Sequence, residues 1–170
     1  MTKKTRVATV WLDGCSGCHM SLLDLDEALI PLAAKIEVVY GPLVDAQEFP
    51  KAVDVTVIEG AISSLEDLEK ARLVRARSKL LVALGDCAVT SNVPSMRNHI
   101  PVKKLLESIY GTVPTDGVPP LLKHTVPLHE AVRVDLHVPG CPPAAKDIAF
   151  VLGELLEGRV PDLACKVKFG

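Results

Sequence analysis

Short runs of apolar, often β-branched residues alternate along the chain with segments whose apolar residues recur at helical spacing. The runs that predict strands are residues 6–12, 36–40, 54–60, 79–85 and 134–138. The segments that predict helices are residues 19–35, 63–77, 102–110 and 144–156. Strands that alternate with helices are typical of a parallel sheet covered on both faces. The pattern therefore predicts an α/β fold, a flavodoxin-like doubly wound parallel sheet of about five strands in three α/β/α layers.

The signals at the helix ends vary in strength along the chain. Ser63 or Ser64 is a suitable N-cap for the second helix, and Glu66 and Asp67 suit its positive N-terminal end. Pro31 is a local complication in the first helix.

Residues 90–130 hold six prolines and form the least regular part, with one short helix expected at 102–110. A loop of that length in a compact domain is usually functional.

Length, composition and charge limit the classes of protein to which this chain can belong. The 170 residues, 48% of them hydrophobic, fit one domain over residues 1–170. Aromatic residues make up only 4%, so Val, Leu, Ile and Ala must fill the core. A net charge of −2 without a long basic cluster argues against nucleic acid as a partner. No export signal and no apolar run of about 20 residues is present, so we expect a cytoplasmic protein without a membrane span.

Four cysteines follow apolar runs, namely Cys15 and Cys18 in LDGCSGCHM, Cys87 in LVALGDCAV and Cys141 in LHVPGCPP. Because parallel strands place their carboxyl ends at one edge, we expect these thiols to share a site. Thiolates bind both cubane iron–sulfur clusters and structural zinc. The last two cysteines are separated from their neighbours by 69 and 54 positions, which disfavours a small zinc knuckle with paired ligands. An iron–sulfur cluster is favoured, with zinc or a dithiol redox pair as alternatives.

Other candidate residues are assigned by their position. Glu59 ends the third strand at the edge of the cysteines, so it is either cluster-proximal or a solvated carboxylate. His19 adjoins Cys18 and is either a donor to a cluster sulfur or an ordinary helix-start residue. Cys165 has no companion motif and is predicted not to be a ligand, and His124 and His129 are predicted to be surface residues. No GxGxxG or Walker-type loop predicts direct NAD or ATP binding.

Four motifs in order, WLDGCSGCHMSLLDLDE, VIEGAI, GDCAVTSNVPSMRN and VPGCPP, resemble the small subunit of a [NiFe]-hydrogenase. The closest resemblance is to the cytoplasmic, bidirectional NAD-reducing type. It implies a flavodoxin-like domain that holds one [4Fe–4S] cluster beside the nickel–iron centre of the large subunit. It also implies that Cys15, Cys18, Cys87 and Cys141 are the cluster ligands and that Glu59 lies beside the cluster.

The sequence departs from other members of the wider family. Membrane-bound and periplasmic relatives begin with a twin-arginine signal and continue into a domain with two more clusters, and this sequence has neither. We therefore expect only the proximal cluster, with electrons leaving to a separate diaphorase-like partner. The cluster-bearing subunit of respiratory complex I is also similar but uses adjacent cysteines, whereas Cys15 and Cys18 are separated by two residues.

The resemblance implies an electron-transfer subunit that is not catalytic alone. Its expected partners are a large subunit with the NiFe centre, where H2 is oxidised or formed, and diaphorase subunits that carry FMN, further Fe–S clusters and the NAD site. The alternatives are a non-catalytic flavodoxin-like module that binds FMN or zinc, and the small subunit of another soluble group of [NiFe]-hydrogenases.

Overall fold

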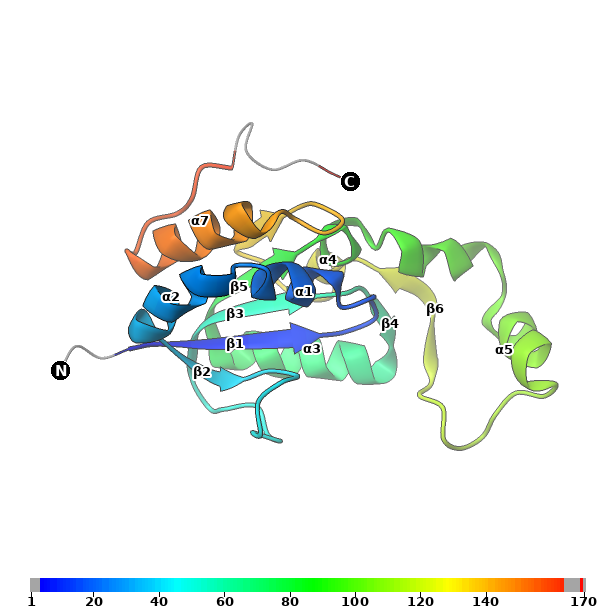
Figure 1. Ribbon diagram of the computed structural model, residues 1–170. Helices are drawn as coiled ribbons and strands as arrows, with labels where there is room; N and C mark the ends of the chain where they lie inside the picture. Colours follow the sequence, from blue (N-terminus) through cyan, green and yellow to red (C-terminus); the bar gives the residue numbers. More distant parts are fainter. Residues whose placement is uncertain (1–3, 164–168, 170) are drawn as a thin grey trace.

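A computed structural model describes residues 4–163 and 169, and its centre is a five-stranded parallel sheet (Figure 1). The strand order is β2-β1-β3-β5-β7, so the chain begins near the middle, adds one strand on one side and then three on the other. This is the flavodoxin-like order predicted from the sequence. The strands are β1 (Thr5–Trp11), β2 (Ile36–Tyr40), β3 (Val53–Glu59), β5 (Ser78–Leu84) and β7 (Leu136–Val138).

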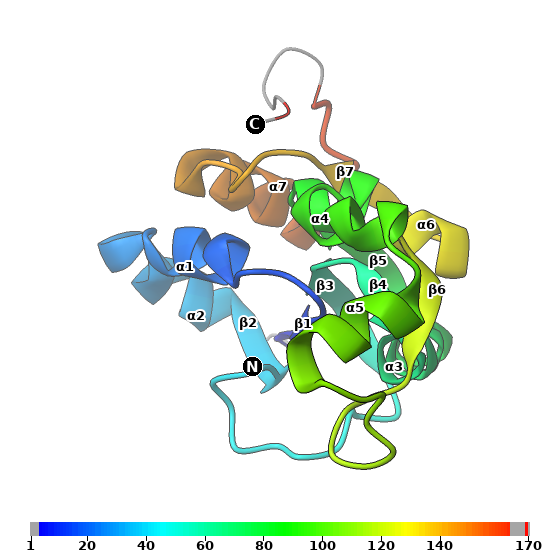
Figure 2. The ribbon, with the colours of Figure 1, turned by 90° about the vertical axis from the view of Figure 1, so that its right-hand side faces the viewer.

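Helices cover both faces of the sheet, which confirms the three-layer arrangement (Figure 2). Successive side chains of β1 point to opposite faces, and Val7 therefore packs in one core cluster while Ala8 packs in the other. The first face is covered by α1 (Gly17–Leu23), α2 (Leu29–Lys35) and α7 (Ala145–Leu156). The opposite face is covered by α3 (Leu65–Arg77), α4 (Asp86–Thr90) and α6 (Leu128–Ala131).

The register of the sheet aligns the carboxyl ends of four strands. Trp11 of β1 pairs with Glu59 of β3, Glu59 pairs with Leu84 of β5, and Leu84 pairs with Val138 of β7. The connections after these four positions therefore begin side by side at one edge. Parallel α/β sheets build their sites in the crevice beyond this edge.

Helix α3 begins as predicted, with Ser64 as its N-cap. The Ser64 side chain accepts a hydrogen bond from the Asp67 amide, and the Asp67 carboxylate accepts one from the Ser64 amide. This reciprocal capping box satisfies donors that the first helical turn leaves free. Among the described helices, α3 with its 13 residues included, none is both long and apolar enough to cross a membrane.

The single helix predicted over residues 19–35 is wrong, because the segment folds as three pieces. Helix α1 ends at Leu23, a 3-10 turn η1 (Asp26–Ala28) follows, and α2 begins at Leu29. Asp26 has a positive φ of 47°, which interrupts the helical path. The break places Pro31 in the first turn of α2, where the missing amide costs no intrahelical hydrogen bond.

The irregular stretch 90–130 contains more regular structure than its prolines predict. The expected short helix is confirmed as α5 (Val102–Tyr110). A 3-10 segment η2 (Val93–His99) precedes it, and β6 (Leu121–Val126) pairs antiparallel with the short strand β4 (Ile62–Ser64) in a separate two-stranded sheet. Figures 1 and 2 show α5 and β6 standing beside the carboxyl edge of the main sheet.

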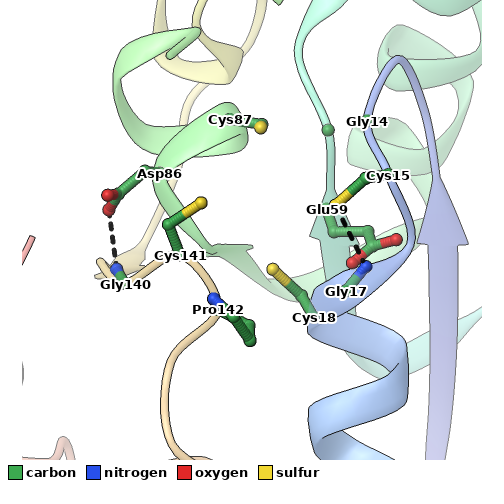
Figure 3. Close-up of a pocket in the computed structure, with 11 residues that line it drawn as sticks. Gly14, Cys15, Gly17, Cys18, Glu59, Asp86, Cys87, Gly140, Cys141 and Pro142 are labelled. Atoms are coloured by element: carbon green, nitrogen blue, oxygen red, sulfur yellow. Dashed lines mark hydrogen bonds between the residues drawn. The ribbon is translucent and has the colours of Figure 1, made fainter. Parts of the chain in front are cut away.

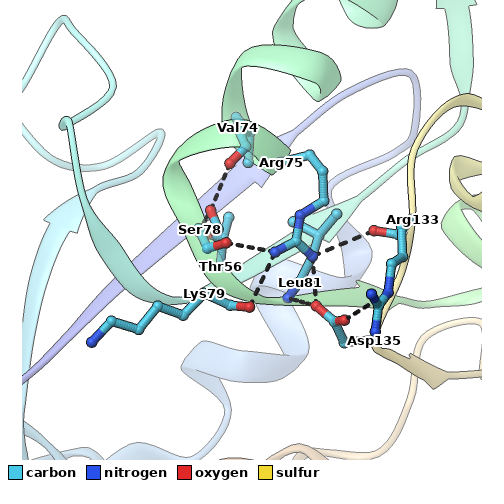
Figure 4. A network of polar contacts seen from close by, with 8 residues as sticks. All are labelled: Thr56, Val74, Arg75, Ser78, Lys79, Leu81, Arg133 and Asp135. Carbon is cyan, nitrogen blue, oxygen red and sulfur yellow. Dashed lines mark hydrogen bonds and ion pairs between the residues drawn. The ribbon is translucent and has the colours of Figure 1, made fainter.

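Strand β7 is shorter than predicted, because a side chain replaces part of its ladder (Figure 4). The Asp135 amide donates to the Leu81 carbonyl at 2.9 Å, while the Asp135 carboxylate accepts from the Leu81 amide at 2.8 Å. Arg75 of α3 binds the same carboxylate and also the Ser78 and Lys79 carbonyl oxygens. Arg133 adds a second, longer ion pair. Burial raises the pKa of Asp135, but these hydrogen bonds and charges outweigh it and hold the pKa below its ordinary value of 3.8.

We expect Asp135→Ala to lower the free energy of unfolding by about 1–3 kcal/mol, because the Leu81 amide and the Arg75 guanidinium each lose a partner. A carboxyl group with a depressed folded pKa stabilises the protein above its unfolded pKa, and this stabilisation is lost as the pH falls through the folded pKa. Urea unfolding at pH 7 should show the full difference, which should shrink below about pH 4. Asp45→Asn, at an exposed loop position, is the control and should match the unsubstituted protein.

Candidate metal centre

The structure brings Cys15, Cys18, Cys87 and Cys141 to one cavity of about 110 Å³ (Figure 3). Cys15 and Cys141 lie in the loops that follow β1 and β7, Cys18 and Cys87 lie in the first turns of α1 and α4, and Glu59 at the end of β3 completes the wall. These are the four strand ends that the register aligns. Cys15 and Cys141 are exposed, while Cys18 and Cys87 are half-buried. In Figure 3 the four cysteine side chains lie around a common space, with Cys15 and Cys18 on one side and Cys87 and Cys141 on the other.

The loop with Cys15 and Cys18 is fixed against the loop that follows β3. Asp13 and Ala61 exchange two backbone hydrogen bonds, of 2.7 and 3.2 Å. Gly14 lies so close to Gly60 that an added Cβ would be 3.2 Å from the Gly60 Cα. The Gly17 amide then donates to the Cys15 Sγ at 3.4 Å. Glycine permits this close backbone approach and leaves an amide directed at a sulfur.

The loops with Cys87 and Cys141 are held together by a second set of hydrogen bonds. The Asp86 amide donates to the Gly140 carbonyl at 2.9 Å, and the Asp86 carboxylate accepts from the Gly140 amide at 2.6 Å. The Gly85 amide also donates to the Val138 carbonyl at 2.8 Å. Asp86 is only 4% exposed, so these bonds form away from water. The spacing between the two cysteines is therefore set by these backbone and carboxylate contacts.

Asp86→Ala should loosen the Cys141 loop and lower the free energy of unfolding by about 1–3 kcal/mol, because the buried Gly140 amide loses its acceptor. Differential scanning calorimetry of the two proteins measures this loss. Asp116→Ala is a control, since this exposed loop carboxylate accepts a hydrogen bond from the next amide in its own loop. An Asp86→Ala protein with the same melting temperature as the unsubstituted protein would contradict the role given to this contact.

Glu59 is a buried carboxylate, 2% exposed, at the base of the cysteine cavity. Its Oε2 accepts from the His19 amide at 3.0 Å, and its Oε1 lies 3.0 Å from the His19 Nδ1. The angles at that second pair do not form a hydrogen bond, so both His19 ring nitrogens lack a hydrogen-bond partner among the described residues. The His19 ring lines a separate apolar cavity beside β2 instead of the cysteine cavity. Glu59 therefore lines the cysteine cavity, whereas His19 contacts Glu59 and lines the second cavity.

The electrostatics of the cavity disfavour free thiolates. Burial raises the pKa of the Cys18 thiol far above its ordinary value of 9.0, and Glu59 raises it further. Burial also raises the pKa of Cys87 to about 11, with additional contributions from Cys141 and Cys15. Four thiolates beside a carboxylate repel one another, and a cationic core is the group that reverses this repulsion. The donor set therefore fits a thiophilic metal centre.

Thiolates bind either a single zinc ion or an iron–sulfur cluster. Tetrahedral zinc needs all of its thiolates at about 2.3 Å from one point. A cubane cluster gives each thiolate its own iron and so accepts sulfurs spread around a larger space. The four thiols that line the cavity match the ligand number of either centre.

Comparison with known proteins identifies the family. Residues 15–155 match the family described as NADH ubiquinone oxidoreductase, 20 Kd subunit. The chain is 35% identical to the NAD-reducing hydrogenase HoxS subunit delta of Cupriavidus necator, covering 96% of this chain and 84% of that protein. The chain belongs to this family, and within it the chain is related to hydrogenase subunits. It is homologous to small subunits of NAD-reducing and other [NiFe]-hydrogenases, which does not favour a non-catalytic FMN or zinc module.

Two further comparisons place this small subunit within the family. A crystal structure of NAD+-reducing [NiFe]-hydrogenase in the H2-reduced state matches with a TM-score of 0.90 and 40% identity, covering 94% of this chain and 95% of that chain. One of the subunits of the F420-non-reducing hydrogenase of Methanocaldococcus jannaschii is 35% identical over 98% of this chain. The chain spans 61% of the length of that relative.

Sequence reasoning missed several residues that shape the site of this small subunit. Gly85, Asp86 and Gly140 set the spacing of the two singleton cysteines, and Asn92 contacts Cys141. The GDC and PGC motifs placed the first three beside cysteines, but no spacing rule predicts a bond between residues 54 positions apart. His124 and His129 are exposed, as predicted. Cys165, predicted not to be a ligand, lies outside the described residues.

Proposed function

We propose that this chain is the electron-relay subunit of a NAD-reducing [NiFe]-hydrogenase and holds one [4Fe–4S] cluster on Cys15, Cys18, Cys87 and Cys141. The observation that carries the proposal is the gathering of four thiols from the segments that follow three strands around one cavity. A cluster bound there takes up and releases one electron at a time, with a potential set by burial and by hydrogen bonds to its sulfurs. We also propose that residues 1–170 act as one domain.

The chain itself supplies position and shielding. Hydrogen bonds between Asp13 and Ala61 and between Asp86 and Gly140 hold these segments, which limits their rearrangement between redox states. Glu59 is only 2% exposed, while Cys15 and Cys141 remain exposed at the rim of the cavity. Glu59 is proposed as a fixed carboxylate beside the cluster, and His19 as the residue that positions it through its amide.

The exposed rim supports a partner subunit as the cover of this site. Trp11 is 46% exposed and donates from its indole to the Gly14 carbonyl, at the base of the first cysteine loop. Val93 and Met96 on η2 are 61% and 69% exposed. Large exposed apolar side chains beside a site mark an interface. We propose that a large subunit with the NiFe centre packs here, where H2 is oxidised or formed, and that electrons continue to diaphorase subunits with FMN, further Fe–S clusters and the NAD site.

The NAD-reducing type is proposed over other hydrogenase groups because a solved enzyme of that type matches the fold with a TM-score of 0.90. The chain is 40% identical to that enzyme, whereas it is 35% identical to the Methanocaldococcus protein. A cytoplasmic location is part of the proposal, since a reducing compartment keeps the cavity thiols available as ligands.

Metal and sulfide analysis of anaerobically purified protein tests the cluster. We expect about four irons and about four acid-labile sulfides per chain, with an electron paramagnetic resonance signal after reduction. Zinc in place of iron, or flavin without sulfide, would contradict the proposal. The assignment to the NAD-reducing type is tested by co-purification with native partners and by H2-dependent reduction of NAD+ by the assembled complex. A complex that reduces a different acceptor and not NAD+ would overturn this assignment.

A further inference from the structure

A side-chain amide reaches one of the proposed ligand sulfurs from a different loop. The Asn92 Nδ2 lies 3.6 Å from the Cys141 Sγ, within the range of a hydrogen bond to sulfur. Asn92 follows α4, the helix that carries Cys87, and it is 49 positions from Cys141 along the chain. The contact therefore joins the segment of one proposed ligand to the sulfur of another.

The backbone at Asn92 is strained and firmly held. Ser91 and Asn92 have φ values of 64° and 25°, and both are non-glycine residues in a region that L-amino acids rarely adopt. Ser91 is 2% exposed and its amide donates to the Cys87 carbonyl at 3.1 Å. The Asn92 carbonyl accepts from the Ser95 hydroxyl at 2.7 Å and from the Ser95 amide at 3.2 Å. Strain of this kind persists only where the surroundings fix it, and it concentrates at functional sites.

A donor at a ligand sulfur acts differently on the two redox states. The reduced cluster carries one more negative charge than the oxidised cluster, so the amide dipole stabilises the reduced state more. We propose that Asn92 is a positioning and tuning residue whose amide raises the reduction potential of the cluster through Cys141. This inference rests on the proposed function, because it needs a cluster on the four cysteines.

The midpoint potential of the cluster in the full chain, purified anaerobically, tests the inference. Asn92→Ala should shift the midpoint potential to a more negative value, because the donor is lost. Asn92→Asp should shift it further in the same direction, since a carboxylate of nearly the same shape places negative charge at the sulfur. Asn92→Gly relieves the strained φ but also removes the amide, and it should behave like Asn92→Ala.

Asn98→Ala is the matched control within the same segment. The Asn98 amide donates to the Thr125 carbonyl at 2.8 Å, away from the cysteine cavity, so its loss should leave the midpoint potential unchanged. Unchanged potentials in Asn92→Ala, Asn92→Gly and Asn92→Asp would overturn the inference while the cluster proposal stands. If the Asn92→Ala protein alone does not retain the cluster, the midpoint potentials of the Asn92→Gly and Asn92→Asp proteins test the inference in its place. An unsubstituted chain without iron and sulfide would instead remove the proposed function.

Discussion

Cys15→Ser, Cys18→Ser, Cys87→Ser and Cys141→Ser variants should each lose most of the iron and sulfide that the unsubstituted chain binds. Each variant replaces one of the four thiols that line the cavity by a hydroxyl, which is a much poorer ligand for iron than a thiolate. The three remaining thiols would leave one iron of the cubane without its protein ligand. Iron and acid-labile sulfide analysis of anaerobically purified variants, normalised to protein, measures the loss.

Cys165→Ser is the matched control, because it makes the same chemical change at the one cysteine without a companion motif. It should retain the iron and sulfide content of the unsubstituted chain. Far-ultraviolet circular dichroism of all five variants separates loss of the cluster from loss of the fold. An equal loss of iron in all five, with the fold intact, would show that the four-ligand assignment is wrong.

The fold could be predicted because its main determinants are local and periodic. The β-branched runs and the amphipathic segments alternate, and this alternation with right-handed crossovers leaves few sheet topologies. The meeting of the cysteines followed from the same pattern. Each proposed ligand comes shortly after a strand whose end is in register with its neighbours, for example Cys87 after Leu84 and Cys141 after Val138. Any parallel sheet of this order places such positions at one edge.

What the sequence did not predict depends on contacts between distant residues. Within the described part of the chain strand β6 pairs only with the three-residue strand β4, and neither has a local pattern that distinguishes it from loop. The break between α1 and α2 depends on a positive φ at Asp26, which helical spacing cannot show. Likewise, the Asp135 carboxylate replaces a ladder bond of β7, and the Asp86 carboxylate binds Gly140. Polar side chains in these roles are indistinguishable by type from surface carboxylates until the fold is known.

Gly85→Ala should remove the cluster while every ligand remains in the sequence. A Cβ at Gly85 would lie 2.2 Å from the Cys18 Sγ and 3.4 Å from the Gly140 carbonyl oxygen, so the Cys18 thiol must move out of its place in the cavity wall. Gly85 also has φ 81° and ψ 160°, a conformation adopted essentially only by glycine, and a side chain there costs about 1–3 kcal/mol. We expect the variant to fold with reduced stability and to retain little iron.

Two alanine substitutions separate the collision from the strain. Gly111 has a similar φ of 78° but an added Cβ meets nothing within 4 Å, so Gly111→Ala should lower stability through strain alone and leave the iron content unchanged. Gly153→Ala, on an exposed position of α7 with no neighbour within 4 Å, should raise the free energy of unfolding by about 0.5–1 kcal/mol. If Gly85→Ala kept the iron content of these two controls, the Cys18 sulfur would not be confined by the Gly85 backbone. Cys18 would then have to reach the metal from a different position, and the cavity described by the four thiols would not be the cluster site.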